Sequence, residues 1–462
     1  MRPITQEAYK LFHEGSQALS EIESHGIRID EEYLQDITAQ LNRRITALVD
    51  KLKGHKFFRR WKKHFGAKTN LGSRDQLGIV LFDIFEYPCN AKTETGRYQV
   101  DETALDAIDH PFVKRYQKLS KLNKARDTYI TNIRKETING FLHAVFNLHL
   151  VSTFRSSSDS PNFQNLPIRN PDTAKIIRRC FIPRDDFRIV EVDYGGIEVC
   201  GAAWYHHDPV MLEYISDPTK DMHRDMAMRC YKLKQSQVSK DIRYCGKNQF
   251  VFPQFYGDYY INCAKSLWAS MEHMNLALPD GTDLEEHLLN KGITELGECS
   301  PDERPVKGTF EHHIQKVEHA FWNKRFKVYN EWKQRWWNDY QKKGYIQSLS
   351  GFAIEGILKR NEAINYPIQG VAFHCLLWSL IRLNKLLKKY KMKSLIIGQI
   401  HDSIVADVHK NEVQDYLQLA NKVMTVDIKK HWEWIITPLE IEAEITPLEG
   451  SWFDKKEIKI SA

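Results

Sequence analysis

The fold is decided by a short apolar stretch that ends in an acid, Arg188-Ile189-Val190-Glu191-Val192-Asp193. Its β-branched residues predict a strand with Asp193 at its end. A second stretch, Gln399-Ile400-His401-Asp402-Ser403-Ile404-Val405, is apolar on both sides of Asp402 and predicts the tip of a tight hairpin. Two carboxylates at adjacent strand ends could hold divalent metal ions. Taken alone, either aspartate is better explained as a turn residue or a strand cap.

The regions around these strands are mostly helical. Apolar residues recur at helical spacing before the first strand and again between the two strands, where Pro279 to Lys307 is rich in Gly, Pro and Asp and predicts a loop. Near the C-terminus, Leu439 to Leu448 alternates well enough to form a last strand. We therefore expect an α+β fold with a helical lobe (residues 1–140) and a strand-bearing lobe (141–206 and 346–462) that carries a helical insertion (207–345).

Composition excludes several classes of protein. The 462 residues carry a net charge of only +6, and 42% are hydrophobic, which is enough for several buried cores. The apolar runs are too short to span a membrane, and Met1 to Thr5 lacks the start of a secretion signal. The 8 cysteines include no Cys-x-x-Cys pair, which indicates reduced thiols. We expect a soluble, cytoplasmic protein that does not bind membranes.

One segment is strongly basic. Lys51 to Asn70 contains no acid, and its basic residues alternate with Phe57, Phe58, Trp61 and Phe65. This pattern is typical of a surface that binds phosphate backbones, and equally of a solvated helix whose aromatic residues pack inward. The basic residues are Lys51, Lys53, Lys56, Arg59, Arg60, Lys62, Lys63 and Lys68.

A second cationic group lies within the helical insertion. Arg243 and Lys247 are four residues apart, so both would project from one face of a helix and could bind a triphosphate. His223 could add a hydrogen-bond donor. Viewed in isolation, the pair is better explained as a solvated helix face, and His223 as a helix-start or packed histidine.

In combination, these residues belong to a series of ordered motifs that resembles the family A DNA polymerases. The resemblance also extends more weakly to Glu21–Asp30 and Asn70–Leu77, so it covers nearly the whole chain. The stronger motifs are Thr153–Ser158 with Pro161–Pro167, Asp193-Tyr194-Gly195-Gly196-Ile197-Glu198, Arg243-x-x-x-Lys247 running to Phe255-Tyr256-Gly257, Asn365–Gly370, and His401-Asp402.

The resemblance implies a right-hand polymerase fold. Residues 1–140 would form a helical thumb, 141–206 and 346–462 an antiparallel-sheet palm, and 207–345 helical fingers. The implied reaction adds deoxynucleotides to a primer 3′ end under the direction of a template, by two-metal phosphoryl transfer with release of pyrophosphate. A single-subunit RNA polymerase and a catalytically silent clamp are the alternative interpretations. Glu198 argues against the first, and the joint presence of Asp193, Asp402, Arg243 and Lys247 against the second.

The resemblance also assigns roles to single residues. Asp193, Asp402 and the Tyr194 carbonyl would hold two Mg²⁺ ions, with Mn²⁺ as a substitute, and Lys247 would assist the leaving pyrophosphate. The incoming nucleotide would contact Arg243, His223, Glu198, Phe252 and Tyr256, and Glu198 would exclude the ribose 2′-hydroxyl. The residues expected to bind DNA are Arg155, Asn162, Gln164, Asn165, Asn365, Gln369 and His401, with Lys56, Arg59, Arg60, Lys62 and Lys63 on the thumb.

The expected partners follow from the same resemblance. They are primer-template DNA and deoxynucleoside triphosphates. The chain begins at the thumb and shows no acidic exonuclease pattern upstream, so we expect proofreading to be absent or supplied by another polypeptide. Replisome proteins are further candidate partners.

The sequence departs from the family pattern at two functional positions. The spacing from Lys247 to Tyr256 is one residue longer than usual and includes Pro253, which suggests a π-bulge and a kinked or ended helix. Either Val251 or Phe252 could then touch the incoming sugar. We favour Phe252, which predicts poor use of dideoxynucleotides. Ser403 occupies the position of a usual third acid, so the role of that acid is lost or moved.

Overall fold

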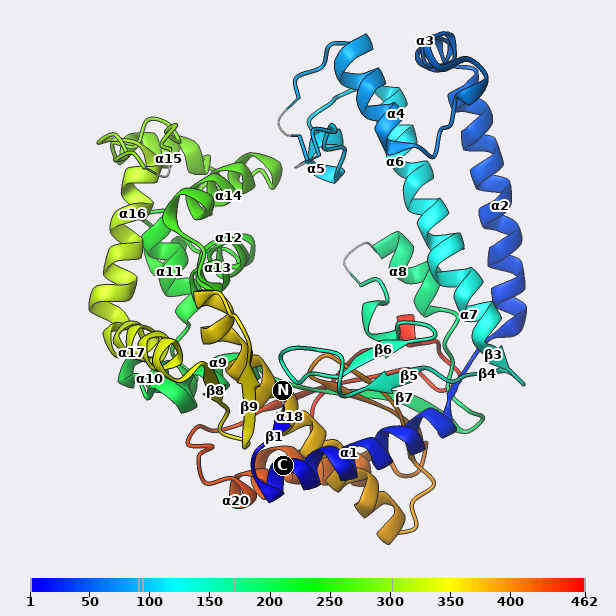
Figure 1. The fold of residues 1–462 in the computed structure, drawn as a ribbon, viewed down its shortest axis with the longest axis vertical. Helices are drawn as coiled ribbons and strands as arrows, with labels where there is room; N and C mark the ends of the chain where they lie inside the picture. The colour runs from blue at the N-terminus through cyan, green and yellow to red at the C-terminus, as the bar shows by residue number, and fades with distance from the viewer. Residues whose placement is uncertain (1, 90–91, 94, 169–170, 301, 461–462) are drawn as a thin grey trace.

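Two helical arms rise from a common base that holds the largest sheet (Figure 1). The computed structural model describes residues 2–89, 92–93, 95–168, 171–300 and 302–460. The first arm is built from segments that precede the sheet strands in sequence, and the second from the insertion between those strands. This arrangement confirms the expected α+β class.

The sheet in the base is antiparallel and has five strands in the order β10-β11-β7-β12-β13. In the central strand β7, Asp193 lies opposite Ser403 of β11 on one side and Glu442 of β12 on the other. The hairpin between β10 and β11 turns through His401 and Asp402, and His401 adopts a left-handed conformation with φ of 49°. The strands are β7 (Phe187–Tyr194), β10 (Leu395–Ile400), β11 (Ser403–His409), β12 (Ile441–Ile445) and β13 (Lys456–Ile458).

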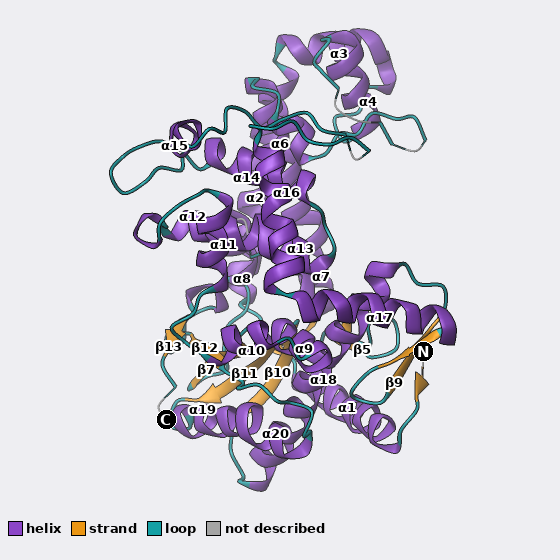
Figure 2. Cartoon of the chain, turned by 90° about the vertical axis from the view of Figure 1, so that its left-hand side faces the viewer, coloured by secondary structure: helices purple, strands orange, loops and turns teal. Residues whose placement is uncertain are grey.

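Helices cover the sheet in the base, as Figure 2 shows from the side. Tightly buried α18 (Arg360–Lys389) packs against α9 (Ile197–His206) and α1 (Gln6–His25), and α1 also contacts β10. Gly15 of α1 permits this approach, because a Cβ there would lie 2.9 Å from a Leu377 methyl. The base also holds α19 (Val413–Asn421) and α20 (Ile428–His431).

Helix α1, which the expected lobe of residues 1–140 includes, packs in the base. The apolar face of α1, which includes Ala8, Leu19 and Ile22, is buried against α18 and β10 in the base. In addition, β1 (Arg2–Pro3) pairs with β9 (Phe352–Glu355). The first arm therefore starts only after α1.

The first arm is a pair of long helices with a small cap. Its α2 (Glu31–Lys53) packs along α6 (Pro111–Lys124), and α3 (Lys56–Phe65) lies at the top of the arm (Figure 1). Phe57 of α3 stacks on Phe85 at 3.9 Å and on Phe112 at 4.3 Å between ring centroids. The remaining helices of the arm are α4 (Arg74–Ile79), α5 (Glu102–Asp106) and α7 (Thr131–Glu136).

The second arm has a core of its own, to which Phe250, Phe310 and Phe321 contribute. The predicted loop from Pro279 to Lys307 is only partly irregular. It contains α15, which begins where the Asp283 side chain caps the helix. Leu284 and Leu288 of this helix are buried in that core. The helices are α10 (Pro209–Ser216), α11 (Met222–Cys230), α12 (Lys240–Cys245), α13 (Phe252–Tyr256), α14 (Tyr260–His273), α15 (Leu284–Asn290), α16 (Phe310–Ala320) and α17 (Lys327–Lys343).

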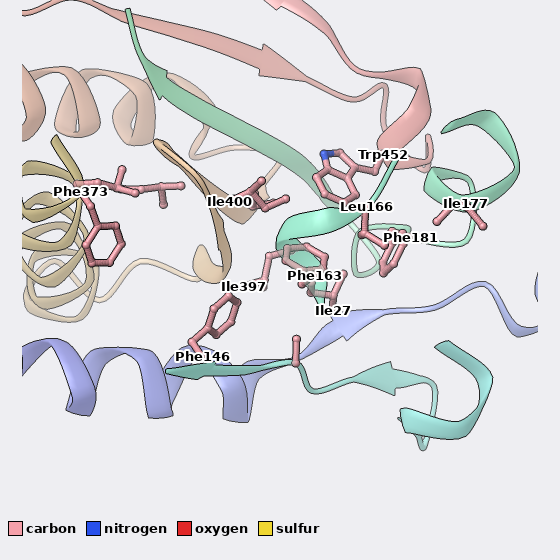
Figure 3. Packing of buried hydrophobic residues seen from close by; sticks show 14 of the residues in the cluster. Ile27, Phe146, Phe163, Leu166, Ile177, Phe181, Phe373, Ile397, Ile400 and Trp452 are labelled. Atoms are coloured by element: carbon pink, nitrogen blue, oxygen red, sulfur yellow. The ribbon is translucent and has the colours of Figure 1, made fainter. Parts of the chain in front are cut away.

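An aromatic cluster joins the first arm to the sheet. Figure 3 shows Phe163 between Trp452, Phe181 and Ile400, with Leu166 and Ile177 close by. The Phe163 and Trp452 rings stack at 5.2 Å between centroids. Two small sheets complete this junction. One has three strands, β2 (Ile27–Arg28), β4 (Phe141–Leu142) and β3 (Thr137–Ile138), and the other pairs β5 (Val145–Asn147) with β6 (Ser157–Asp159). Helix α8 (Pro171–Arg178) follows them, and β8 (Tyr345–Gln347) pairs with β9 in the base.

Candidate active site

The two predicted aspartates lie together where strand β7 ends and the β10–β11 hairpin turns. Asp193 pairs across the sheet with Ser403, the residue after Asp402, and the Tyr194 N–H donates to the Asp402 carbonyl at 3.4 Å. The Asp193 side chain reaches solvent, yet the protein around it excludes enough water to raise its pKa to about 7, with further contributions from the charges of Asp402 and Glu191. Burial also raises the pKa of Asp402, more than the positive charge of Arg155 lowers it.

This pair of carboxylates fits a divalent cation. The Asp402 Oδ1 atom is buried and has no hydrogen-bond partner among the described residues. A nearby cation would satisfy that oxygen and relieve the repulsion between the two acids, and Mg²⁺ prefers oxygen ligands of this kind. No group of three or more His, Cys, Asp and Glu side chains in the described ranges is suited to a metal. Further ligands would therefore come from the main chain, water or substrate.

Ser403, at the position of the missing acid, contacts a different acid. Its hydroxyl lies 3.1 Å from Glu191 Oε1 and 2.9 Å from the Ile400 carbonyl. Lys455 and Trp452 donate to Glu191 Oε2 at 2.6 and 3.1 Å. Burial opposes ionisation of Glu191, but the charge and hydrogen bond of Lys455, with the Trp452 hydrogen bond, outweigh it and lower the pKa of this carboxyl.

A cavity of about 520 Å³ opens beside Asp402. Its walls come from the loop before the sheet, the end of β7, α9, the second arm and α18, so segments far apart in sequence converge on it. It brings together eight of the predicted site residues: Arg155, Tyr194, Glu198, Phe252, Tyr256, Asn365, His401 and Asp402.

Glu198 is the centre of a closed polar network in this cavity. Its two carboxylate oxygens accept hydrogen bonds from the Arg155 guanidinium and the Tyr256 hydroxyl. Burial, together with the hydrogen bond to Glu198, raises the pKa of Tyr256 above its usual value. Arg155 also donates to the Gln369 carbonyl at 3.4 Å, and Asn365 donates to the Tyr256 carbonyl at 3.4 Å.

The predicted triphosphate residues lie on two neighbouring helices of the second arm. Arg243 of α12 forms an ion pair with Asp221 at 2.6 Å, while Lys247 lies 5.1 Å above the Phe252 ring. His223 of α11 faces the same ring at 5.7 Å between centroids. Burial, with the positive charges of Lys247 and Arg243, lowers the pKa of His223 to about 4, so its imidazole is neutral at pH 7. The His223 Nδ1 atom is buried without a partner among the described residues.

The expected π-bulge is confirmed. A π-helical segment, Gly246–Val251, joins α12 to α13 and absorbs the extra residue between Lys247 and Tyr256. Pro253 was expected to kink or end the helix. It does not end it, because it lies in the first turn of α13, where its missing N–H and fixed φ are tolerated. Val251 is fully buried, whereas Phe252 lines the cavity. Of the two candidate residues, Phe252 is therefore the one that faces the cavity.

Several side chains that were predicted to bind DNA form hydrogen bonds within the protein. Gln164 donates to Ser156 at 2.8 Å and to Gln399 at 2.7 Å. Asn162 caps a short helical turn by accepting from the Asn165 N–H at 3.1 Å. Asn162, Asn165 and His401 remain exposed. These contacts hold the loop against the sheet and leave part of its polar edge free.

Helix α3, which carries most of the basic segment, lies at the top of the first arm (Figure 1). Both of its sequence interpretations are compatible with the structure, because Phe57 and Trp61 are buried while the cations point outward. The exposed cations of α3 are Lys56, Arg59, Arg60, Lys62 and Lys63.

Sequence reasoning missed the contacts of Glu191, Trp452 and Lys455. Glu191 lies two residues before Asp193, so both side chains project from the same face of β7. That spacing was a usable signal for Glu191. The two C-terminal partners have no local signal, because their pairing depends on β13 returning to the sheet.

Two carboxylates at the strand ends of an antiparallel sheet, flanked by two helical arms, are the arrangement of the right-hand polymerase fold. The chain belongs to DNA polymerase family A: the model of that family matches residues 31–275 and 314–450.

Known relatives agree with this assignment. The chain is 26% identical to the thermostable DNA polymerase I of Thermus thermophilus over 94% of the chain and 47% of the relative. It is 25% identical to DNA polymerase I of Geobacillus stearothermophilus over 95% of the chain and 45% of the relative. It thus spans about half the length of the curated relatives it matches.

A solved structure shares the fold. It is the POL domain of Pol1 from M. smegmatis in complex with DNA primer-template and dNTP, with a TM-score of 0.72 and 22% identity over 96% of this chain and 70% of that one. Within the described ranges, no helix combines the length and the apolar character needed to cross a membrane.

Proposed function

We propose that this chain is a DNA-directed DNA polymerase that adds deoxynucleotides to a primer 3′ end and releases pyrophosphate. The observation that carries the proposal is the meeting of Asp193 and Asp402 beside a cavity lined by Glu198, Phe252 and Tyr256. The names of the relatives, and the primer-template and dNTP bound by the structural neighbour, support the same substrates.

Asp193 and Asp402 would hold two Mg²⁺ ions, or Mn²⁺, with the Tyr194 carbonyl as a further ligand. When bound, such ions stabilise the attacking and leaving oxygens of an in-line phosphoryl transfer. The unpartnered Asp402 Oδ1 and the raised pKa of Asp193 support this role. The two side chains fix the position at which the primer 3′-hydroxyl and the nucleotide α-phosphate meet.

The second arm, proposed as the fingers, would bind the triphosphate. Arg243 and Lys247 supply positive charge, and neutral His223 supplies an N–H donor. Lys247 is the residue we assign to the leaving pyrophosphate. Arg243 is held by Asp221 in this structure, so a triphosphate would share or replace that ion pair.

The walls of the cavity would select the sugar and the template base. Glu198 is fixed by Arg155 and Tyr256, so a ribose 2′-hydroxyl would meet a carboxylate that has no room to move. Phe252 would contact the sugar, and its ring has no polar group to replace a missing 3′-hydroxyl. Tyr256 would stack at the templating position.

The remaining assignments concern the duplex. Arg155, Asn162, Gln164, Asn165, Asn365, Gln369 and His401 would contact primer-template, and α3 would bind phosphates at the end of the thumb. The thumb would comprise the first arm, and the palm would include α1. We assign no proofreading nuclease to this chain. A 3′-mismatched primer should therefore not be shortened unless a separate exonuclease is added.

Primer extension in Mg²⁺ tests the proposal. We expect growth with dNTPs, little growth with rNTPs, and none in Asp193→Ala. Preference for rNTPs would indicate an RNA polymerase instead. Binding of primer-template without extension would indicate a silent clamp.

A further inference from the structure

A buried chain of contacts links the C-terminal segment to the turn that carries Asp402. Lys455 and Trp452 both donate to Glu191 Oε2, and the other oxygen of Glu191 lies 3.1 Å from the Ser403 hydroxyl. Glu191 and Lys455 are only 13% and 16% exposed, so their charges are largely withdrawn from water.

The geometry of the sheet gives this chain of contacts a direct connection to both aspartates. Glu191 and Asp193 project from the same face of β7. Ser403 is opposite Asp193 in the sheet and follows Asp402 in sequence. The hydrogen bond from Ser403 to Glu191 therefore joins the strand of one aspartate to the turn of the other.

Trp452, which donates to Glu191, is itself held in place by two neighbours. The Trp452 ring stacks on Phe163, and the Arg178 guanidinium lies 4.2 Å from its centroid (Figure 3 shows the two rings). Because its ring is clamped, Trp452 presents its N–H to Glu191 in one orientation. Lys455 is shared with Glu444, the residue opposite Glu191 on β12.

We propose that Glu191 is a positioning residue that fixes the Asp402 turn through Ser403, with Lys455 and Trp452 as its anchors. The inference rests on the proposed polymerase function. The competing explanation is a purely structural ion pair that stabilises the edge of the sheet. The two differ in prediction, since only a positioning role changes the catalytic rate at temperatures where the protein stays folded.

Single-nucleotide addition by Ser403→Ala, Glu191→Ala and the double variant separates these explanations. For each single variant we expect kcat to fall by about tenfold, as for the loss of one well-placed hydrogen bond. The Mg²⁺ concentration that gives half of the maximal rate should rise. The KM for dNTP and the affinity for primer-template should stay within about twofold of the parent chain. The double variant should be no slower than Glu191→Ala, because both substitutions break the same link.

Two further variants serve as a second measurement and a control. Lys455→Met should lower kcat in the same direction as Glu191→Ala. Glu444→Gln removes the other partner of Lys455 without touching Ser403, and should leave kcat and the Mg²⁺ requirement unchanged. Thermal unfolding of every variant shows whether the assay temperature lies below its Tm.

Three results would overturn the inference. They are unchanged kcat in both single variants below their Tm, additive losses in the double variant, or an equal loss in Glu444→Gln. A parent chain that fails to extend any primer would instead contradict the proposed function, so the two failures are distinguishable.

Discussion

The role proposed for Glu198 depends on the side chains around it. A free glutamate could rotate away from a ribose hydroxyl, but Arg155 and Tyr256 occupy both of its oxygens. The rigidity of this network, more than the size of Glu198, should provide the selectivity against ribonucleotides. Tyr256 is also the residue proposed to stack at the templating position. In this proposal, one residue therefore serves both sugar selection and template reading.

Glu198→Ala should therefore relax sugar selection. We expect the ratio of kcat/KM for dNTP over rNTP to fall by about 10- to 100-fold, because the carboxylate that clashes with the 2′-hydroxyl is gone. Steady-state kinetics with matched dNTP and rNTP pairs measure this ratio. An unchanged ratio would remove Glu198 from this role.

At the scale of elements, the helix from α12 through the π-helical segment to α13 places Lys247 and Phe252 against His223. This depends on close packing at Gly246, where an added Cβ would lie 2.8 Å from the Ala227 Cβ and 2.9 Å from the His223 carbonyl. The extra residue was detectable in sequence because the spacing from Lys247 to Tyr256 is too long for the family pattern. The register that it produces, with Val251 buried and Phe252 exposed to the cavity, required the fold.

Gly246→Ala should push the helix that carries Lys247 and Phe252 away from α11, which carries His223 and Ala227. We expect it to lower the free energy of unfolding by about 1–3 kcal/mol, as overpacking does, and to raise the KM for dNTP. Urea titration and steady-state kinetics measure the two effects. Gly54→Ala is the matched control, since a Cβ at Gly54 would meet only the backbone carbonyls of Asp50 and Lys51, at 3.5 and 3.8 Å. Equal behaviour of the two variants would contradict the assignment of close packing.

Helix α3 should contribute affinity for DNA but not catalysis. Replacing Lys56, Arg59, Lys62 and Lys63 by Ala should weaken primer-template binding and reduce the slope of log K against log salt by about 0.9 for each phosphate that is no longer neutralised. The kcat at saturating DNA should not change. Lys389→Ala with Lys430→Ala, on exposed positions of the base, is the control. An unaltered salt slope would favour the solvated-helix interpretation.

For the whole molecule, sequence was informative where the pattern is local. The runs of β-branched residues predicted β7 and the β10–β11 hairpin, and the resemblance brought Asp193 and Asp402 together. It was uninformative where long-range packing decides. Nothing local shows that α1 belongs to the base, or that Lys455 would pair with Glu191, 264 residues earlier. The short α15 was hidden in a polar stretch because only a few of its residues are apolar.

Buried histidines should make the whole fold sensitive to acid. His374 is fully buried among Phe12, Phe154 and Phe352, and burial lowers its pKa to about 3. Below pH 6.5 His374 binds a proton in the unfolded chain but stays neutral in the folded chain. The stability present at neutral pH is therefore lost as the pH falls toward 3. Each such histidine lowers the free energy of unfolding by about 1.4 kcal/mol per pH unit.

His374→Phe should flatten this pH dependence by about that amount between pH 6 and 4, whatever its effect at pH 8. Urea titrations at several pH values provide the slope. A variant with the slope of the parent chain would show that His374 can accept a proton in the folded state.

The central claim is that Asp193 and Asp402 act together on the transferred phosphoryl group. The most direct test is the single-turnover rate of nucleotide addition by Asp402→Asn on saturating primer-template in Mg²⁺. We predict a fall of at least about 10³-fold, since the variant keeps the shape of the site but loses the charge that holds the ions. A rate within about tenfold of the parent chain would contradict the account.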